Sequence, residues 1–290
     1  MTGTTHKHTS PRTTAPQDQP RDVTVALAQI TTGKDVAANL AHAVRSVEEA
    51  AKKGAEVIVL PEATMRAFDA GRLDEIAQEL DGEFATTLQQ VALSLGVVVV
   101  AGMFRPSDTI QRGDKRINRV FNTALITGPD VHLGYNKIHC YDAFNYRESD
   151  TVHPGEQLVT FTFKGLTFGV ATCYDVRFPE QFKALAQAGA QAIILPASWQ
   201  DGDNKLHQWR TLTRARALDS TSYVLACGQA RPGGAQRAGQ DEGPTGIGHS
   251  AIIDPAGTPV AEAGYGEEII LGTLRGEHLE KVRAMIPVLH

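Results

Sequence analysis

The chain has 290 residues, of which 42% are hydrophobic and 21% charged, and its formal net charge is −5. These values are ordinary for a globular protein with a large core, and they lack the basic footprint of a nucleic-acid-binding protein. No apolar run approaches the about 20 residues that a membrane-spanning helix requires. We therefore expect neither nucleic acid nor membrane among the partners.

The N-terminal segment differs in composition from the rest of the chain. It has no hydrophobic stretch of the kind found in secretory signals, and it is rich in Thr, Pro and Gln. We predict a disordered tail over residues 1–21 and one folded domain over residues 22–290. Three cysteines without close spacing argue against a disulfide framework and favour a reducing, cytoplasmic location. No zinc-binding pair of cysteines or histidines is present, so we expect no metal.

Apolar runs alternate with stretches of helical spacing in the first half of the chain. They predict strand 23–30, helix 35–54, strand 55–62, helix 82–96 and strand 97–104. A polar segment that contains Arg112, Lys115 and Arg116 is predicted to be a loop. Two more strands, 119–127 and 131–139, are expected to form a hairpin about Gly128-Pro129-Asp130.

The second half follows the same plan. It predicts a hairpin of 158–163 and 166–173, helix 178–188, strand 190–198, helix 205–220, and strands 222–229, 248–254, 258–264 and 267–274. The segments "AKKGAEVIVLPEA" (51–63) and "AQAGAQAIILPAS" (186–198) are alike from helix end to strand end. We infer an α/β fold in which two related βαβ halves pack as a four-layer α-β-β-α sandwich.

Two polar side chains follow predicted strands, where α/β proteins place their sites. Glu62 follows "VIVLP", whereas the related segment has Ala197, so the carboxylate is an addition to one copy. Cys173 follows "FGVAT" and precedes a helix whose Pro179 suits the first turn. A helix N-terminus would lower the pKa of this thiol and make it a nucleophile. The alternative is a small buried core cysteine, which is the interpretation we give to Cys227.

A thiol nucleophile requires a base and a group that stabilises the developing oxyanion. His139, His207 and His249 are available as bases, but none stands at a strand end with an evident partner. Lys137 ends the strand "HLGYN". It is either a solvated strand end or a fixed positive charge for the oxyanion.

Three motifs in order resemble the nitrilase superfamily of carbon–nitrogen hydrolases: "VLPE", "YNKIH" followed by "YRES", and "CYDVRFPE". The resemblance extends from about residue 23 to the C-terminus and includes "PASW" and "GHSAIIDPAGTPVAEAG". It implies the sandwich fold of that family and a cofactor-free Glu-Lys-Cys triad made of Glu62, Lys137 and Cys173. A second glutamate of the family corresponds to Glu148, which would position the lysine and the substrate nitrogen.

The implied reaction is hydrolysis of a small linear amide to a carboxylate and ammonia through a Cys173 thioester. In it, Glu62 is the general base, and Lys137 stabilises the tetrahedral intermediate together with the backbone N–H of Tyr174. The sequence Cys-Tyr-Asp-x-Arg-Phe resembles the branch of ω-amidase and deaminated-glutathione amidase, rather than the Cys-Trp-Glu of nitrile-hydrolysing relatives. A nitrilase, an N-carbamoyl hydrolase and a non-catalytic scaffold protein remain alternatives.

The resemblance also implies substrate contacts by Tyr174, Arg177, Ser198 and Trp199. Arg177 would bind a distal carboxylate of the substrate, with an ion pair to Asp175 or Glu180 as the alternative. The segment "QDGDNKLHQW" departs from the family pattern, and we expect its Asp201 and Asp203 to bring negative charge near the pocket. Family members pair through the helix that corresponds to residues 205–219, so we expect a homodimer or a larger homo-oligomer.

Overall fold

A computed structural model describes residues 22–143 and 146–289 of the chain. The predicted tail over residues 1–21 lies outside the described residues. No helix within the described part is long and apolar enough to span a bilayer.

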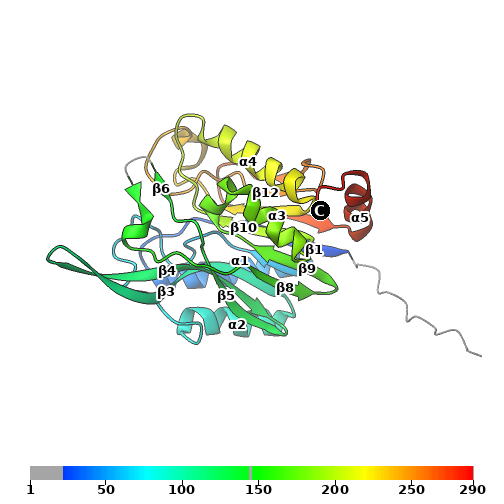
Figure 1. Cartoon of the computed structure of the whole chain (residues 1–290). Helices are drawn as coiled ribbons and strands as arrows, with labels where there is room; N and C mark the ends of the chain where they lie inside the picture. Colours follow the sequence, from blue (N-terminus) through cyan, green and yellow to red (C-terminus); the bar gives the residue numbers. More distant parts are fainter. Residues whose placement is uncertain (1–21, 144–145, 290) are drawn as a thin grey trace, which may run out of the picture.

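Two six-stranded sheets form the centre of the molecule (Figure 1). The first has the order β14 (Glu268–Leu274), β1 (Val23–Gln29), β2 (Val57–Val59), β3 (Val98–Arg112), β4 (Lys115–Gly128) and β5 (Val131–Asn136). The second has the order β13 (Pro259–Glu262), β12 (Ala251–Ile253), β11 (Tyr223–Gly228), β10 (Ala192–Ala197), β9 (Leu166–Val170) and β8 (Val159–Phe163). A two-stranded sheet, β6 (Asp142–Ala143) and β7 (Tyr146–Arg147), lies apart from them.

Each sheet is covered on its outer face by helices. The first contacts α1 (Val36–Lys52) and α2 (Glu83–Leu95), and the second contacts α3 (Pro179–Gln187) and α4 (Lys205–Ser220). A third apolar cluster lies between the two sheets, formed by side chains from both. Three buried clusters thus separate four layers, which confirms the predicted α-β-β-α sandwich.

The two halves repeat one topology. Strands β1, β2 and β3 pair in parallel, as do β9, β10 and β11, and a helix connects each consecutive pair. Parallel strands present their carboxyl ends at one edge of the sheet, where α/β proteins form their sites. The repeated segments noted in the sequence correspond to the connections into β2 and β10. The related halves are therefore confirmed, and both direct strand ends toward a common region.

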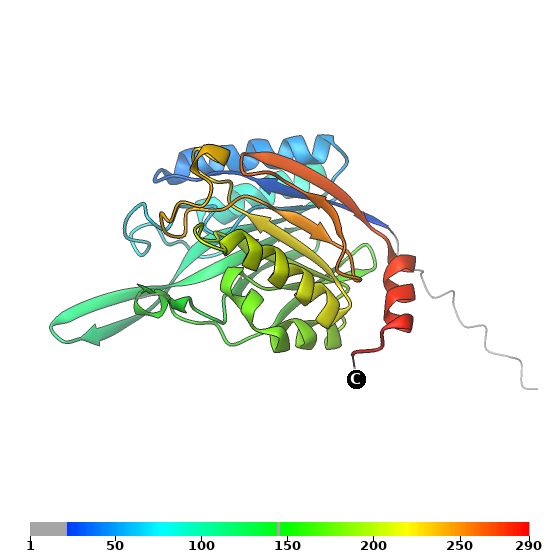
Figure 2. The same ribbon diagram turned by 90° about the horizontal axis from the view of Figure 1, so that it is seen from above.

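Two segments differ from the sequence predictions. The polar segment around Arg112 is not a loop, because β3 and β4 remain paired out to Arg112 and Lys115. They form an arm that extends beyond the sheets (Figures 1 and 2). An ion pair of Arg112 with Asp150 ties the arm to the body. The final helix, α5 (Gly276–Met285), was not predicted; it buries only a narrow apolar face, formed chiefly by Leu279 and Val282.

Candidate active site

Cys173 stands at a sharp turn after β9. Its φ is +47°, in the left-handed region that is uncommon for a residue with a side chain. A 3₁₀ helix, Cys173–Arg177, follows, and α3 begins only at Pro179. Backbone strain of this kind is concentrated at functional sites. The turn holds the thiol at the carboxyl end of its strand, in a position where 9% of the residue is exposed.

Glu62 follows β2 and is 1% exposed. Its Oε1 accepts hydrogen bonds from Asn122 Nδ2 at 2.7 Å and from Lys137 Nζ at 3.1 Å. Its Oε2 accepts one from the backbone N–H of Ser198 at 2.8 Å. The negative charge of this carboxylate acts on the Cys173 thiol, and both groups line one pocket. One carboxylate from the first half of the chain is thus the common neighbour of the thiol and the ammonium group.

The position of Glu62 depends on a glycine in the neighbouring strand. A Cβ atom at Gly102 of β3 would lie 2.7 Å from the Cα of Glu62 and 2.4 Å from the backbone N of Ala63. Both distances are shorter than van der Waals contact. The absence of a side chain at Gly102 therefore allows the backbone that bears the glutamate to pack directly against β3.

Lys137 follows β5 and is 2% exposed. Its Nζ donates to Glu148 Oε2 at 2.9 Å and to Glu148 Oε1 at 3.1 Å, besides its bond to Glu62. Burial alone would lower the pKa of Lys137, but the carboxylates of Glu148 and Glu62 outweigh it and raise that pKa well above its ordinary value. The lysine is therefore a permanent buried cation, which excludes the alternative of a solvated strand end.

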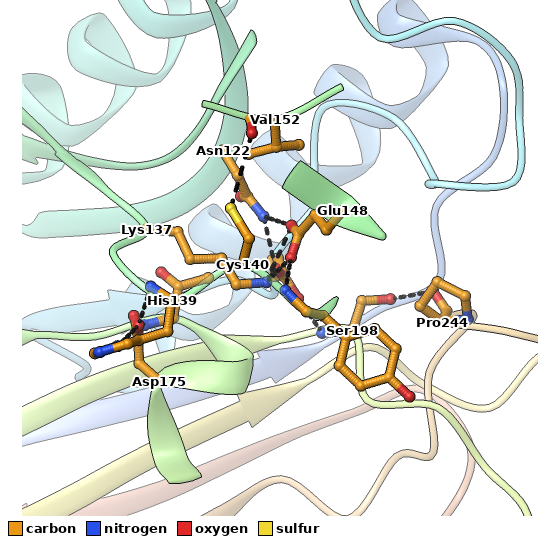
Figure 3. A network of polar contacts seen from close by, with 12 residues as sticks. Asn122, Lys137, His139, Cys140, Glu148, Val152, Asp175, Ser198 and Pro244 are labelled. Atoms are coloured by element: carbon orange, nitrogen blue, oxygen red, sulfur yellow. Dashed lines mark hydrogen bonds and ion pairs between the residues drawn. The ribbon is translucent and has the colours of Figure 1, made fainter. Parts of the chain in front are cut away.

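Glu148 begins a short 3₁₀ helix, Glu148–Asp150, and is 3% exposed. Besides Lys137, it accepts a hydrogen bond from the backbone N–H of Tyr141 at 2.6 Å. The three groups Asn122, Lys137 and Glu148 point toward one another in Figure 3. The structure thus brings the second glutamate of the "YRES" motif to the lysine, as the resemblance implies.

The pKa of the thiol departs from the sequence prediction. Burial raises the pKa of Cys173 well above its ordinary value, the negative charge of Glu62 raises it further, and Lys137 opposes this. Cys173 is the first residue of a short 3₁₀ helix and does not stand at the first turn of α3, so a long helix dipole does not act on it. The expected lowering by a helix N-terminus is therefore wrong. At rest the thiol is therefore neutral.

Asn122 was missed by sequence reasoning. It lies in β4, is 1% exposed, and donates through Nδ2 to Glu62 Oε1 at 2.7 Å and to Glu148 Oε1 at 3.2 Å. The one signal in the sequence was an amide within the otherwise apolar run "VFNTALI". Such a residue is equally compatible with a structural hydrogen bond.

Glu62, Lys137, Glu148 and Cys173 line a pocket of about 470 Å³, a volume that includes its opening to solvent. The lining combines four aromatic side chains with three cationic ones, two carboxylates and one amide. It comprises Glu62, Phe68, Lys137, Tyr141, Glu148, Cys173, Tyr174, Arg177, Ser198, Trp199, Gln200, Lys205 and Pro244. All eight residues predicted for catalysis or substrate binding are among them.

The predicted substrate-binding residues have distinct environments. Arg177 donates to Gln208 Oε1 at 2.7 Å, and its guanidinium carbon lies 5.2 Å from the ring centre of Trp199. No ion pair with Asp175 or Glu180 is found in the described part of the chain. Ser198 supplies its backbone N–H to Glu62 and donates its hydroxyl to the carbonyl of Pro244. Ser198 therefore supports the base and the pocket wall.

A buried arginine orders the segment 231–245, which contributes Pro244 to the pocket wall. Arg231 Nε lies 3.3 Å from Asp201 Oδ2, and Nη2 lies 3.1 Å from Glu242 Oε2. Asp201 also accepts from the backbone N–H of Gly239 at 2.8 Å. Asp201 and Asp203, which were expected to bring negative charge near the pocket, do not face into it. Asp201 is paired with Arg231, Asp203 is exposed, and neither lines the pocket.

A buried carboxylate connects the lysine segment to the nucleophile turn. Asp175, in the 3₁₀ helix after Cys173, accepts hydrogen bonds from Tyr135 Oη at 2.6 Å and from the backbone N–H of Thr172 at 2.8 Å. It also accepts from the backbone and the ring of His139, at 2.9 and 2.8 Å. None of the three histidines considered as bases lines the pocket within the described residues.

Comparisons with known proteins agree with this geometry. The family model described as carbon-nitrogen hydrolase matches residues 24–284. The chain is 42% identical over 273 residues to "Hydrolase Rv0480c" of Mycobacterium tuberculosis, with 91% of this chain and 94% of that protein covered. It is 35% identical over 247 residues to the deaminated glutathione amidase of Escherichia coli O157:H7, with 83% and 86% covered.

A solved structure is similar over nearly the whole chain. Saccharomyces cerevisiae Nit3, described as a member of branch 10 of the nitrilase superfamily, superimposes with a TM-score of 0.78 at 30% identity. The match covers 96% of this chain and 98% of that one. This chain is therefore a member of the carbon-nitrogen hydrolase family, in the nitrilase superfamily, and it is an enzyme that hydrolyses non-peptide amide bonds.

Proposed function

We propose that the enzyme hydrolyses a small linear amide to a carboxylate and ammonia through a thioester on Cys173. The observation that supports this proposal is the convergence of Glu62, Lys137, Glu148 and the thiol at the base of one pocket. An acid–base group and a fixed cation beside a thiol are the parts that nucleophilic amide hydrolysis requires.

In the first step, the Cys173 sulfur attacks the amide carbon while the thiol proton moves to Glu62. A carbon–sulfur bond forms, and the carbonyl π electrons move to oxygen. Because the resting thiol is neutral, proton transfer accompanies attack rather than preceding it. The positive charge of Lys137 and the backbone N–H of Tyr174 stabilise the oxyanion. The net charge of the buried cluster is unchanged, because the proton acquired by Glu62 offsets the new negative charge on oxygen.

In the second step, the tetrahedral intermediate expels ammonia. The carbon–nitrogen bond breaks, the nitrogen takes the proton from Glu62, and the carbonyl reforms as a thioester. Water then attacks the thioester and gives a proton to Glu62. The carbon–sulfur bond breaks, the proton returns from Glu62 to sulfur, and the carboxylic acid leaves and loses its own proton to solvent to become the carboxylate. Glu62 thus acts twice as base and twice as acid, and its neighbours Lys137 and Ser198 hold it in place throughout.

Two cationic residues in the lining favour an amide whose far end is anionic. Arg177 and Lys205 are both in the pocket wall, and burial followed by the charge of Arg177 lowers the pKa of Lys205. Both cations therefore belong to the lining of one pocket. The charge of Asp201, which would oppose an acidic substrate, is compensated by Arg231. A carboxylate on the substrate fits a guanidinium and an ammonium group of this kind.

Ammonia release from a panel of linear amides tests the proposal, with Cys173→Ala as the inactive variant and Cys140→Ser as the matched control. Cys140 is half-buried, donates to the carbonyl of Val152 and does not line the pocket. We expect Cys173→Ala to abolish turnover and Cys140→Ser to retain it. A covalent acyl adduct on Cys173 is expected by intact-protein mass spectrometry with a slow amide.

The same assays distinguish the alternatives. A nitrilase would release ammonia from the corresponding nitrile, and an N-carbamoyl hydrolase would release carbon dioxide with the ammonia. Turnover that persists in Cys173→Ala, or an acyl adduct on another residue, would contradict the proposed mechanism.

A further inference from the structure

Asn122 occupies a position between the two glutamates that resembles that of Lys137. The amide and the ammonium group each donate to Glu62 Oε1 and to Glu148 Oε1, at distances of 2.7 and 3.2 Å for the amide and 3.1 and 3.1 Å for the ammonium. The four polar groups therefore form a closed ring of two donors and two acceptors. Figure 3 shows the amide nitrogen directed at Glu148, beside the lysine.

We propose that Asn122 is a positioning residue that holds Glu62 and Glu148 together as ionised carboxylates and leaves Lys137 able to turn an N–H bond toward the oxyanion. This inference rests on the proposed function. Without Asn122, the lysine is the only group among the described residues that bridges the two carboxylates. If Lys137 then turned one of its three N–H bonds to the substrate, the two that remain would be the whole connection between the glutamates.

The chemical identity of the side chain fits this role. Two carboxylates and one ammonium give the resting cluster a charge of −1, and an amide adds two N–H donors without adding charge. An aspartate at position 122 would add a third negative charge to a buried site. An apolar residue would remove a donor that stabilises the charged form of Glu62, and Glu62 must be charged to act as the base.

The orientation of the amide is determined by the carboxylates. Ionised carboxylates accept hydrogen bonds and cannot donate them, so Nδ2 rather than Oδ1 must face both. The Oδ1 atom is buried and has no hydrogen-bond donor among the described residues. Asn122 thus satisfies the catalytic carboxylates while its own oxygen is left unsatisfied. A residue present only for the stability of β4 would pair both ends of its amide.

The test compares the pH dependence of kcat/KM for wild type, Asn122→Ala, Asn122→Ser and Asn122→Asp. The control is Asn118→Ala, at an exposed position four residues earlier in β4. Because Asn122 Nδ2 donates to Glu62 Oε1, its loss removes a hydrogen bond that favours the charged form of the base. We expect the acid limb of the Asn122→Ala profile to move upward by about one pH unit, with kcat/KM at least about 10-fold lower near neutral pH.

Asn122→Asp should move the acid limb further than Asn122→Ala, because a third carboxylate repels the charged base. Asn122→Ser keeps one donor and should give a smaller shift. Asn118→Ala should leave the profile unchanged. If Asn122→Ala does not fold, as judged by circular dichroism, the serine variant provides the same comparison. An acid limb that stays in place in the folded variants overturns the inference, whatever their rates, because a purely structural role lowers activity equally at all pH values.

The proposed function is tested separately by the turnover of wild type and its loss in Cys173→Ala. If wild type releases no ammonia from any amide, or Cys173→Ala remains active, the proposed function fails. If wild type is active as proposed and the Asn122 profiles coincide with it, only the present inference fails.

Discussion

Asp175 accepts hydrogen bonds from both the backbone N–H and the ring Nδ1 of His139, at 2.9 and 2.8 Å. His139 follows Lys137 by two residues, and Asp175 follows Cys173 by two. The His139 ring also stacks on Phe178, with ring centres 3.5 Å apart and planes inclined by 7°. The cation and the nucleophile, which come from different sheets, are therefore held in register by one pair of residues outside the pocket.

Replacing Asp175 with asparagine should impair both stability and catalysis. The amide keeps the volume of the side chain but directs N–H bonds at groups that are themselves donors, including Tyr135 Oη and the backbone N–H of Thr172. We expect a loss of about 3 kcal/mol in the free energy of unfolding, measured with urea, and a fall in kcat of at least about 10-fold. The exposed Asp203→Asn is the control. An Asp175→Asn enzyme with wild-type kcat would show that the register of the two segments does not depend on this carboxylate.

Glu62→Gln should make alkylation of Cys173 faster and amide hydrolysis slower. The negative charge of Glu62 is, after burial, the main factor that raises the pKa of the thiol, so its removal lowers that pKa and increases the thiolate fraction at pH 8. Alkylation of Cys173 by iodoacetamide should therefore become faster in the variant. Hydrolysis should become slower by about 10²–10⁴-fold, because the base is lost.

In the wild-type enzyme, the alkylation rate of Cys173 should continue to rise above pH 9 rather than level off near the pKa of an ordinary thiol. Peptide mass spectrometry assigns the modified cysteine, and the exposed Glu280→Gln is the control. Slower alkylation in Glu62→Gln, or a plateau below pH 8.5 in wild type, would contradict a buried neutral thiol.

Arg177→Met and Lys205→Met should raise KM for an anionic amide more than KM for a neutral amide. If the far end of the substrate is anionic, each variant loses a charge-assisted contact, and KM for an amide with a terminal carboxylate should rise by about 10-fold or more. KM for a neutral amide of the same length should change little. The exposed Lys183→Met in α3 should affect neither substrate. An equal rise of KM for both amides would indicate that the two cations shape the pocket without recognising charge.

Gly102→Ala should displace Glu62. The new methyl group would lie 2.4 Å from the backbone N of Ala63, so the turn after β2 must shift. We expect kcat to fall by at least about 10-fold and the free energy of unfolding to decrease by about 1–3 kcal/mol. Gly266→Ala is the matched control, because a Cβ atom there meets nothing within 4 Å. Full activity in Gly102→Ala would mean that the glutamate tolerates a shifted backbone.

Much of the fold and of the site could be predicted from the apolar runs in the sequence and from the polar residues at their ends. Continuous apolar runs such as that before Glu62 indicate buried parallel strands, and polar side chains directly after them indicate a site. The motifs around Lys137, Glu148 and Cys173 supplied the remaining candidates, and the structure brings all of them together. The expected homodimer or larger homo-oligomer stays a prediction, which light scattering tests.

Other properties depended on contacts between distant segments. Asn122 touches residues 60 positions before it and 26 after it, and a single amide in a strand does not reveal such partners. The neutralisation of Asp201 depends on Arg231, which is remote in the sequence. The thiol pKa depends on burial, which local sequence does not report. The arm of β3 and β4 was interpreted as a loop because its side chains are polar on both faces.

Arg231 anchors the segment 231–245 through contacts that do not involve the reactive groups. The guanidinium is fully buried and bonds to Asp201, Glu242 and the carbonyl of Gln240, none of which touches the thiol or its base in the described structure. The segment 231–245 is therefore fixed by a buried anchor away from the thiol, and it reaches the reactive groups through Pro244, whose carbonyl accepts from Ser198. Substitutions elsewhere in this segment should alter the pocket only through Pro244, because that is its one lining residue in the described structure.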